Sequence, residues 1–385
     1  MFISVYTIAK DEEANAARWY GCFKEADEVC VLVNNSTDKT AEILKGLGAK
    51  VKVKNYDHFR FDVARNDAMK LCSKKADLLF GCDMDDTVES GWRKKVEHAW
   101  ELGVKSGKDP NSILFTYCVR YNNSPTGCQR FVRHSIHTPD GWYWKDRIHE
   151  HLEHKDHKNF IYYPKFEMSS TTCLKNHGIY LGLLEEMAAE KGCSPRAVHL
   201  LAREYLLNRR FQEAIDTFKR YLSMPDATWN CERAASMKFM SDCYFSLGDK
   251  VQQELWLWKA MAEDPLDRDS PFILGKNLIA KKEYSIAVPV LKRCLDIKEP
   301  QLDFPYFTLE AWGEQPWFCL AEALFYVGNW DEADRAIAEG LKINPQNTIG
   351  LQLKADMERN RKIGNPHKPP TIIPRYRIEI PELMK

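Results

Sequence analysis

Three acidic side chains fall within four residues, directly after the short apolar run that ends at Cys82. They are Asp83, Asp85 and Asp86. Carboxylates packed this closely repel one another unless a cation neutralises them. Oxygen ligands of this type suit Mg²⁺ or Mn²⁺, which they often share with phosphate oxygens. A solvated acidic turn that caps the next helix is the alternative interpretation.

Histidines recur between His149 and His157 and suggest a second kind of metal site. The segment starts as a near miss for the zinc motif H-E-x-x-H, because Glu153 stands where the second histidine should be. His151, His154 and His157 would share one face of a helix and could bind a metal there. A solvated polar face is the alternative, and a zinc hydrolase is the least favoured functional hypothesis.

The first half of the chain alternates between strand and helix patterns. The predicted elements are, in order, strand 2–8, helix 11–24, strand 28–33, helix 40–46, strand 50–54, helix 62–73 and strand 77–82. Such alternation predicts an α/β, Rossmann-like domain with a mostly parallel sheet and helices on its faces. Ligands bind these sheets beyond the carboxyl ends of the strands, where polar clusters stand at 10–12, 36–38 and 83–86.

From about residue 194 the pattern changes to helix pairs with the spacing of tetratricopeptide repeats. The matching positions in four consecutive units are Ala202, Tyr205, Ala214 and Phe218; Tyr244, Leu257, Ala260 and Pro265; Leu274, Gly275, Ala287 and Leu291; and Trp317, Leu320, Ala321, Leu324, Ala333, Ile337 and Pro345. Small residues let paired helices approach closely, and large ones fill the gaps between repeats. We also expect Trp256 and Trp258 to pack between helices.

These patterns predict three regions, at 1–180, 194–350 and 351–385. The first is the α/β domain, the second an all-α tetratricopeptide-like array with an insertion near 300–316, and the third an extended, proline-rich tail.

Composition excludes several classes of protein. The 385 residues are 44% hydrophobic, which excludes disorder throughout the chain. Lys and Arg number 55, as do Asp and Glu, so no global charge favours nucleic acid. The 12 cysteines contain no C-x-x-C pair, and no apolar run reaches the roughly 18 residues of a membrane span. We therefore expect a cytoplasmic protein with free thiols.

Five segments resemble family 2 glycosyltransferases of the GT-A type, particularly the bacterial and phage branch that carries tetratricopeptide repeats. They are I-A-K-D-E-E at 8–13, S-T-D-K-T at 36–40, F-D-V-A-R-N-D-A at 61–68, D-M-D-D at 83–86, and the run R-F-V-R at 130–133, G-W at 141–142 and R-I-H-E at 147–150. They are similar to that family's I-x-K-N-E-E, S-T-D-G-T, F-x-x-A-R-N-x-A, D-A-D-E and R-L-F-R…G…I-H-E patterns. Together they cover about the first 155 residues, in the family's order.

The resemblance implies roles for individual residues. Asp83 and Asp85 would hold Mn²⁺ or Mg²⁺, with Asp85 as the direct ligand and His149 completing the metal or diphosphate site. Glu150 would be the general base for the acceptor hydroxyl. The residues expected to bind the nucleotide sugar are Thr7, Lys10, Glu12, Asn34, Ser36, Asp38, Arg65, Asn66 and Asp83. The family usually ends its second strand with an aspartate, where Val33-Asn34-Asn35 stands here, and this leaves recognition of the base open.

The implied activity is inverting, metal-dependent transfer of a hexosyl or pentosyl group from a nucleotide sugar, with a UDP-sugar favoured. The acceptor would be a hydroxyl on a macromolecule, either a protein or peptide held by the repeats or a modified base in phage-type DNA. The repeats could also form a homodimer, and no membrane partner is expected. The alternative is a non-catalytic scaffold with a degenerate transferase domain, which Asn34-Asn35 supports and the intact Asp83 and Asp85 oppose.

Overall fold

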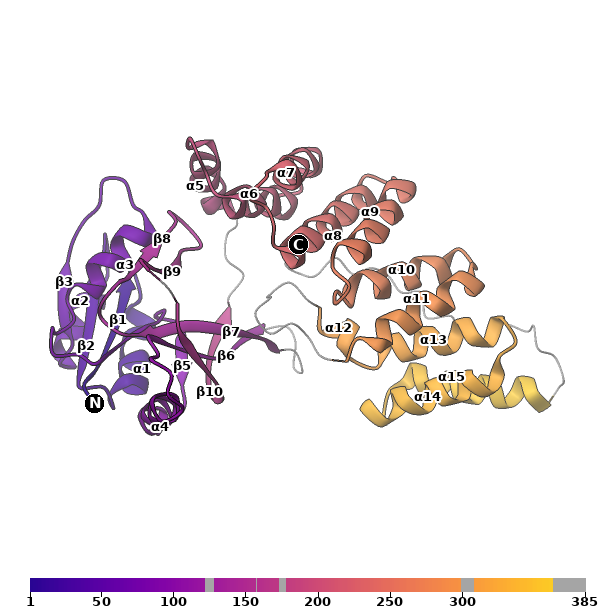
Figure 1. Ribbon diagram of the computed structural model, residues 1–385, viewed down its shortest axis with the longest axis horizontal. Coiled ribbons are helices and arrows are strands. Elements are labelled where there is room, and N and C mark those ends of the chain that lie inside the picture. The colour runs from indigo at the N-terminus through magenta and orange to yellow at the C-terminus, as the bar shows by residue number, and fades with distance from the viewer. Residues whose placement is uncertain (122–127, 157, 173–177, 299–307, 363–385) are drawn as a thin grey trace. The chain divides into compact units, whose positions relative to one another are not determined.

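The chain forms two compact units in a computed structural model, Met1–Asn176 (unit 1) and His177–Lys385 (unit 2), both drawn in Figure 1. The structure describes residues 1–121, 128–156, 158–172, 178–298 and 308–362. The two units are described separately below.

Unit 1 is built on an eight-stranded sheet with the order β3-β2-β1-β4-β7-β6-β10-β5. Its strands are β1 (Ile3–Ala9), β2 (Glu28–Val33), β3 (Lys50–Val53), β4 (Leu78–Gly81), β5 (Asp86–Val88), β6 (Ser112–Tyr121), β7 (Cys128–His137) and β10 (Phe160–Thr172). The first four strands pair in parallel. Beyond β4 the sheet is mixed, because β7 runs antiparallel to both β4 and β6, and β5 runs antiparallel to β10. The expectation of a mostly parallel sheet is therefore correct only for the first half of the unit.

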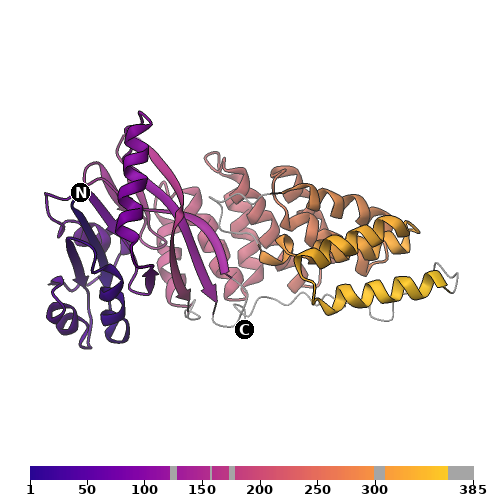
Figure 2. The same cartoon turned by 90° about the horizontal axis from the view of Figure 1, so that it is seen from below.

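Helices cover both faces of the sheet, as the alternating side chains of β1 require. Val5 faces one core, in which α1 (Glu13–Phe23) and α4 (Trp92–Lys105) contribute Trp19, Phe23 and Trp92. Tyr6 faces the other core, with Ala64 and Ala68 of α3 (Phe61–Met69). The remaining helix of this unit, α2 (Thr40–Gly46), contacts α1 and β3. Helix α4 lies along β6 and β10 (Figure 2).

A small hairpin of β8 (Trp142–Lys145) and β9 (His151–His154) contacts α3. Trp142 and Trp144 of this hairpin are buried in the same core as Tyr6. Because β9 is a strand, His151 and His154 do not share a helical face, and His157 lies outside the described residues. The less favoured hypothesis, a metal site on one helix face, therefore does not hold for His151 and His154.

Unit 2 consists of antiparallel helix pairs, visible in sequence along the chain in Figure 1. The pairs are α6 (Pro195–Leu207) with α7 (Phe211–Ser223), α8 (Asn230–Ser246) with α9 (Lys250–Glu263), α10 (Asp269–Ala280) with α11 (Tyr284–Asp296), and α13 (Gln315–Tyr326) with α14 (Trp330–Ile343). Three further helices are α5 (Gly178–Ala189), α12 (Leu309–Trp312) and α15 (Thr348–Lys362).

Small residues at predicted repeat positions lie where paired helices meet, whereas Pro265 and Pro345 are exposed beyond the ends of α9 and α14. Ala202 and Ala214 are fully buried where α6 meets α7. A Cβ atom added at Gly275 would lie 2.4 Å from Leu291 Cδ2, so the third pair needs glycine at this position. The same backbone hydrogen bond closes the turn of all four pairs: Arg210 N to Tyr205 O, Asp249 N to Tyr244 O, Glu283 N to Leu278 O and Asn329 N to Leu324 O. The four matches found in the sequence are thus four equivalent structural units.

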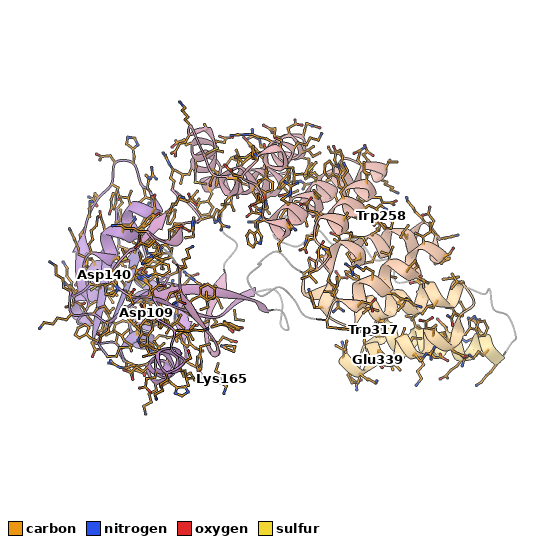
Figure 3. The ribbon with its side chains drawn as sticks, viewed as in Figure 1. Asp109, Asp140, Lys165, Trp258, Trp317 and Glu339 are labelled. Atoms are coloured by element: carbon orange, nitrogen blue, oxygen red, sulfur yellow. The ribbon has the colours of Figure 1, made fainter. Side chains whose placement is uncertain are left out.

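Three expectations for unit 2 need comment. The extended tail does not start at residue 351, because residues 351–362 continue helix α15, and residues 363–385 lie outside the described part. The predicted insertion near 300–316 contains the short helix α12. Residues 299–307 lie outside the described part of the chain. Trp256 packs on the core, but Trp258 is 42% exposed and projects from α9 (Figure 3), so the expectation that it packs between helices was wrong.

Two absences apply to the described ranges only. No helix there is both long and apolar enough to cross a membrane. The ten cysteines whose side chains the structure describes are free thiols.

Candidate functional site

The acidic cluster, Asp83, Asp85 and Asp86, forms the loop that follows β4. Asp86 shapes this loop, because its buried carboxylate accepts hydrogen bonds from Asp83 N (2.7 Å) and Tyr117 Oη (2.6 Å). Burial raises the pKa of Asp86 to about 7; Arg133 opposes the rise and Asp83 adds to it. Arg18 holds the loop through its carbonyl oxygens rather than its carboxylates.

Asp83 is held by two arginines. Arg65 Nη2 contacts one carboxylate oxygen of Asp83, and Arg133 Nη2 lies 3.2 Å from the other. The position of Arg133 follows from the sheet, since β7 is antiparallel to β4 with Ile136 opposite Phe80. Asp83 lies three residues after Phe80, and Arg133 lies three residues before Ile136. The antiparallel pairing therefore brings Asp83 and Arg133 together.

Asp85 is the least restrained acid of the cluster. Its Oδ2 accepts a hydrogen bond from Ser170 Oγ at 2.9 Å, and no other hydrogen bond to its carboxylate occurs within the described residues. One carboxylate oxygen from each of Asp83, Asp85 and Asp86 lies within 4.8 Å of the others. In the described ranges this is the one group of three acids, cysteines or histidines close enough to hold a metal ion.

Arg65 joins the acidic cluster to Glu150. Its Nε donates to Glu150 Oε1 (2.7 Å), its Nη1 donates to the carbonyl of Cys82 (3.0 Å), and its guanidinium lies 5.0 Å from the ring centre of Trp144. Burial disfavours the charge on Arg65, but Asp83 and Glu150 outweigh burial and raise its pKa above the ordinary value. Arg65 is therefore a fixed cation between two acids.

The charges around this loop do not balance. The four carboxylates are those of Asp83, Asp85, Asp86 and Glu150. The guanidiniums of Arg65 and Arg133 face them. For these six side chains the sum is −2 when every group is ionised and −1 when Asp86 is protonated. Arg18, a third guanidinium at the loop, donates to the carbonyl oxygens of Met84 and Asp86 and pairs with none of these carboxylates. Surplus carboxylate oxygen within 4.8 Å fits a divalent cation, and such hard ligands suit Mg²⁺ or Mn²⁺.

His149 and Asn66 have different surroundings from those acids. His149 is exposed, with a backbone φ of 53°, and it is not in the group that could hold a metal. Asn66 pairs with the backbone of Trp144, donating to its carbonyl at 2.8 Å and accepting from its N–H at 2.9 Å. Asn66 thus fixes the β8–β9 hairpin against α3.

Six of the residues expected around the nucleotide lie on β1 or in the loops that follow β1 and β2, and several of them join these two loops to each other. Ser36 Oγ accepts from Asp11 N at 2.9 Å, and Asp38 accepts from Glu13 N at 2.9 Å and from Thr40. These hydrogen bonds, with that of Thr40 first, lower the pKa of Asp38. The two loops therefore form one connected edge.

The other four predicted nucleotide contacts differ in exposure. Thr7 and Asn34 are buried, and Lys10 is exposed. Glu12 accepts a hydrogen bond from Asn15 at 2.7 Å. Lys10 is therefore the most accessible of these side chains.

Three contributors to the site were not identified from the sequence as site residues. They are Arg133, Tyr117 and Ser170. The R-F-V-R segment was a signal for Arg133, but nothing local in the sequence indicates that β7 pairs with β4.

Behind the arginines lies a buried polar chain. Trp144 Nε1 donates to Tyr6 Oη at 2.8 Å, and Tyr6 Oη lies 3.0 Å from His137 Nε2. Gly81 makes room for it, because a Cβ atom there would lie 2.9 Å from the ring of Tyr6. This chain fixes Trp144, on which Arg65 rests.

Comparison with known proteins agrees with this geometry. Residues 4–109 match the family described as glycosyl transferase family 2. An uncharacterized glycosyltransferase of Rickettsia typhi is 35% identical over 97 residues, which are 25% of this chain and 32% of that protein. One from Rickettsia bellii is 34% identical over 97 residues, with the same coverage. The chain thus spans about a third of the length of these relatives.

Solved structures resemble the chain over somewhat less than half its length. The C-terminal part of a TPR repeat-containing protein from Cytophaga hutchinsonii is 16% identical, covering 49% of this chain and 68% of that one with a TM-score of 0.40. YrrB, described as a TPR protein with an unusual peptide-binding site, is 13% identical, covering 46% and 84% with a TM-score of 0.35. Residues 4–109 are a glycosyltransferase family 2 domain, and a tetratricopeptide-like helical region follows it.

Proposed function

We propose that this protein transfers a sugar from a nucleotide-sugar donor to a hydroxyl group, with Mn²⁺ or Mg²⁺ as cofactor. The observation that carries the proposal is the surplus of carboxylate beyond β4 in a family 2 domain. Asp85 and Asp83 would hold the cation, which as a Lewis acid supports the departure of the nucleoside diphosphate. His149 stays a candidate for the diphosphate side of the site.

The donor would bind along the edge formed by the loops after β1 and β2. Lys10, Glu12 and Asn34 would lie near the base and ribose, and Ser36 and Asp38 would keep the edge in place through the hydrogen bonds described above. The family resemblance favours a UDP-sugar. Asn34 stands where the family usually carries an aspartate, which leaves the recognition of the base open.

Glu150 is the proposed general base for an inverting reaction. Its Oε1 is paired with Arg65, while Oε2 makes no hydrogen bond with the described residues. The ion pair orients Glu150, so Oε2 could take the proton of the attacking hydroxyl. Glu150→Gln should reduce turnover by roughly a hundredfold and change donor affinity little. A loss confined to donor binding would instead make Glu150 a positioning residue for Arg65.

The acceptor would be a hydroxyl on a macromolecule, and a protein or peptide is favoured over a modified base in DNA. Helical repeat arrays present extended surfaces to polypeptides. The formal net charge of zero gives no general attraction to the DNA backbone.

Thermal unfolding of the full chain with a panel of nucleotides tests the donor site. The panel contains UDP, GDP, CDP, ADP and their common sugar conjugates, each with and without Mn²⁺. A ligand at about 100 times its dissociation constant stabilises a protein by roughly 2.7 kcal/mol. A Mn²⁺-dependent shift with one nucleotide would support the transferase and name its base. No shift with any of them would favour the non-catalytic scaffold.

A further inference from the structure

The two arginines that hold Asp83 differ in how firmly they are anchored. Arg65 has two partners besides Asp83, the carboxylate of Glu150 and the carbonyl of Cys82, and its side chain is 5% exposed. Turning Arg65 away from Asp83 would break both other hydrogen bonds. Arg65 is therefore a permanent part of the site.

Among the described residues, Arg133 is held by the acidic cluster and by one aromatic ring. It lies 3.2 Å from Asp83 Oδ2 and 3.5 Å from Asp86 Oδ2, and its guanidinium lies 4.7 Å from the ring centre of Tyr117. Both distances exceed the 2.7–2.9 Å usual for charge-assisted hydrogen bonds. The side chain is 19% exposed, so solvent and ligands can reach it.

A divalent cation and Arg133 compete for the same oxygen. Both carboxylate oxygens of Asp83 already contact guanidinium groups, so a cation shared by Asp83 and Asp85 would sit beside the positive charge of Arg133. A metal cation and a guanidinium that share one carboxylate repel each other unless an anion comes between them. The diphosphate of the proposed donor is such an anion, and a guanidinium can bind phosphate oxygens through two parallel hydrogen bonds.

We propose that Arg133 is a diphosphate-binding residue that neutralises Asp83 only while the site is empty. This inference rests on the proposed function. When a cation and a nucleotide enter, the guanidinium leaves Asp83 and pairs with the diphosphate, while Tyr117 stays beneath it as a stacking surface. The charge lost at Asp83 is replaced by that of the cation, so the acidic cluster remains neutralised.

Replacing Arg133 should move two affinities in opposite directions. The variants are Arg133→Gln and Arg133→Lys, with Arg93→Gln as control. Arg93 is a similarly buried arginine on α4, paired with Asp27 and Glu97. Electron paramagnetic resonance of free Mn²⁺ gives the affinity for the cation without nucleotide. Calorimetry in saturating Mn²⁺ then compares UDP with UMP, and likewise the GDP, CDP and ADP pairs.

In Arg133→Gln, Mn²⁺ alone should bind about threefold to tenfold more tightly, because a neighbouring positive charge is gone. The diphosphate should bind roughly tenfold more weakly, with the monophosphate within about twofold of wild type. Arg133→Lys should keep the wild-type Mn²⁺ affinity and restore part of the diphosphate affinity. Arg93→Gln should change none of the three.

Two results would overturn the inference and leave the proposed function standing. One is a wild type that prefers diphosphate and an Arg133→Gln variant that keeps this preference. The other is a parallel loss of Mn²⁺, diphosphate and monophosphate binding, which would mean that Arg133 only supports the loop. A wild type that binds no nucleoside diphosphate, with or without Mn²⁺, would instead overturn the proposed function and this inference with it.

Discussion

Each unit buries a cluster of charged side chains, and the two clusters differ in balance. In unit 1, Arg65 and Arg133 face more carboxylates than they can neutralise. In unit 2, Lys238 on α8 pairs with Asp269 on α10 at 2.6 Å, and Asp269 also accepts hydrogen bonds from the backbone and side chain of Thr308.

This difference in charge balance suggests different roles: the cluster in unit 1 is suited to binding a ligand, and the pair in unit 2 is suited to packing. Burying a cation with one well-bonded anion can be nearly neutral for folding, whereas surplus charge destabilises the fold. The pair in unit 2 links neighbouring repeats. Burial raises the pKa of the neighbouring Asp242 to about 7, so this third carboxyl can be neutral beside the pair. The cluster in unit 1 needs a bound cation to be neutral. The substitutions below test this difference between the two clusters.

The largest effect on activity is expected at Asp85, the acid of the cluster with the fewest contacts to the described protein. Asp85→Asn should lower Mn²⁺ affinity and sugar transfer by roughly a hundredfold or more, because even residues that only orient metal ligands contribute ten- to hundredfold. The melting temperature without metal should stay nearly unchanged, since a single hydrogen bond to Ser170 is altered. Activity and metal titration on one preparation check both statements. Wild-type transfer in this variant would remove the metal assignment.

The pair in unit 2 should respond in the opposite way. Asp269→Ala leaves the buried Lys238 without its main partner and should destabilise the protein by about 3–5 kcal/mol. Mn²⁺ affinity should not change. Chemical denaturation followed by circular dichroism, combined with the Mn²⁺ titration, measures both quantities.

The double variant Lys238→Met with Asp269→Leu sharpens the comparison. It removes both charges and should recover most of the stability lost in Asp269→Ala, because an apolar pair of similar volume often replaces a buried ion pair without loss. If the double variant is as unstable as Asp269→Ala, the pair is needed for more than charge balance.

The same contrast explains how much could be predicted from the sequence. The acidic cluster was identified because its three members are adjacent in the chain, and strand 28–33 and helix 40–46 were predicted because their patterns are local. The partners of the cluster come from far away in sequence: Arg133 is 50 residues from Asp83, and Ser170 is 85 residues from Asp85.

Those partners depend on the pairing of β7 with β4 and of β10 with β5, which no local pattern specifies. No strand was predicted from 112 to 172 for this reason. The repeats of unit 2 were easier, because each contact recurs at a fixed spacing within one helix pair. The same regularity gave no indication that Trp258 would face solvent.

The smallest effect is expected at Glu322 on α13, a buried charge in unit 2 that tests the comparison most closely. Its side chain is 2% exposed, and its Oε2 has no hydrogen-bond partner. Burial alone raises the pKa of Glu322 to about 7 from 4.5. An acid with a raised pKa in the folded state stabilises fully below pH 4.5, and this stability is lost as the pH rises to about 7.

Glu322→Gln should therefore be more stable than wild type at pH 8 by about 1–3 kcal/mol, with the difference shrinking toward pH 5. Glu339→Gln on α14 is the matched control, since the side chain of Glu339 is 43% exposed and pairs with Lys342. Figure 3 labels Glu339. Asp242, whose pKa burial also raises to about 7, keeps its own pH dependence in both variants and cancels from the comparison. A difference that is the same at pH 5 and pH 8 would mean that Glu322 is neutralised by a cation in solution. In that case unit 2, like unit 1, would hold carboxylate for a ligand.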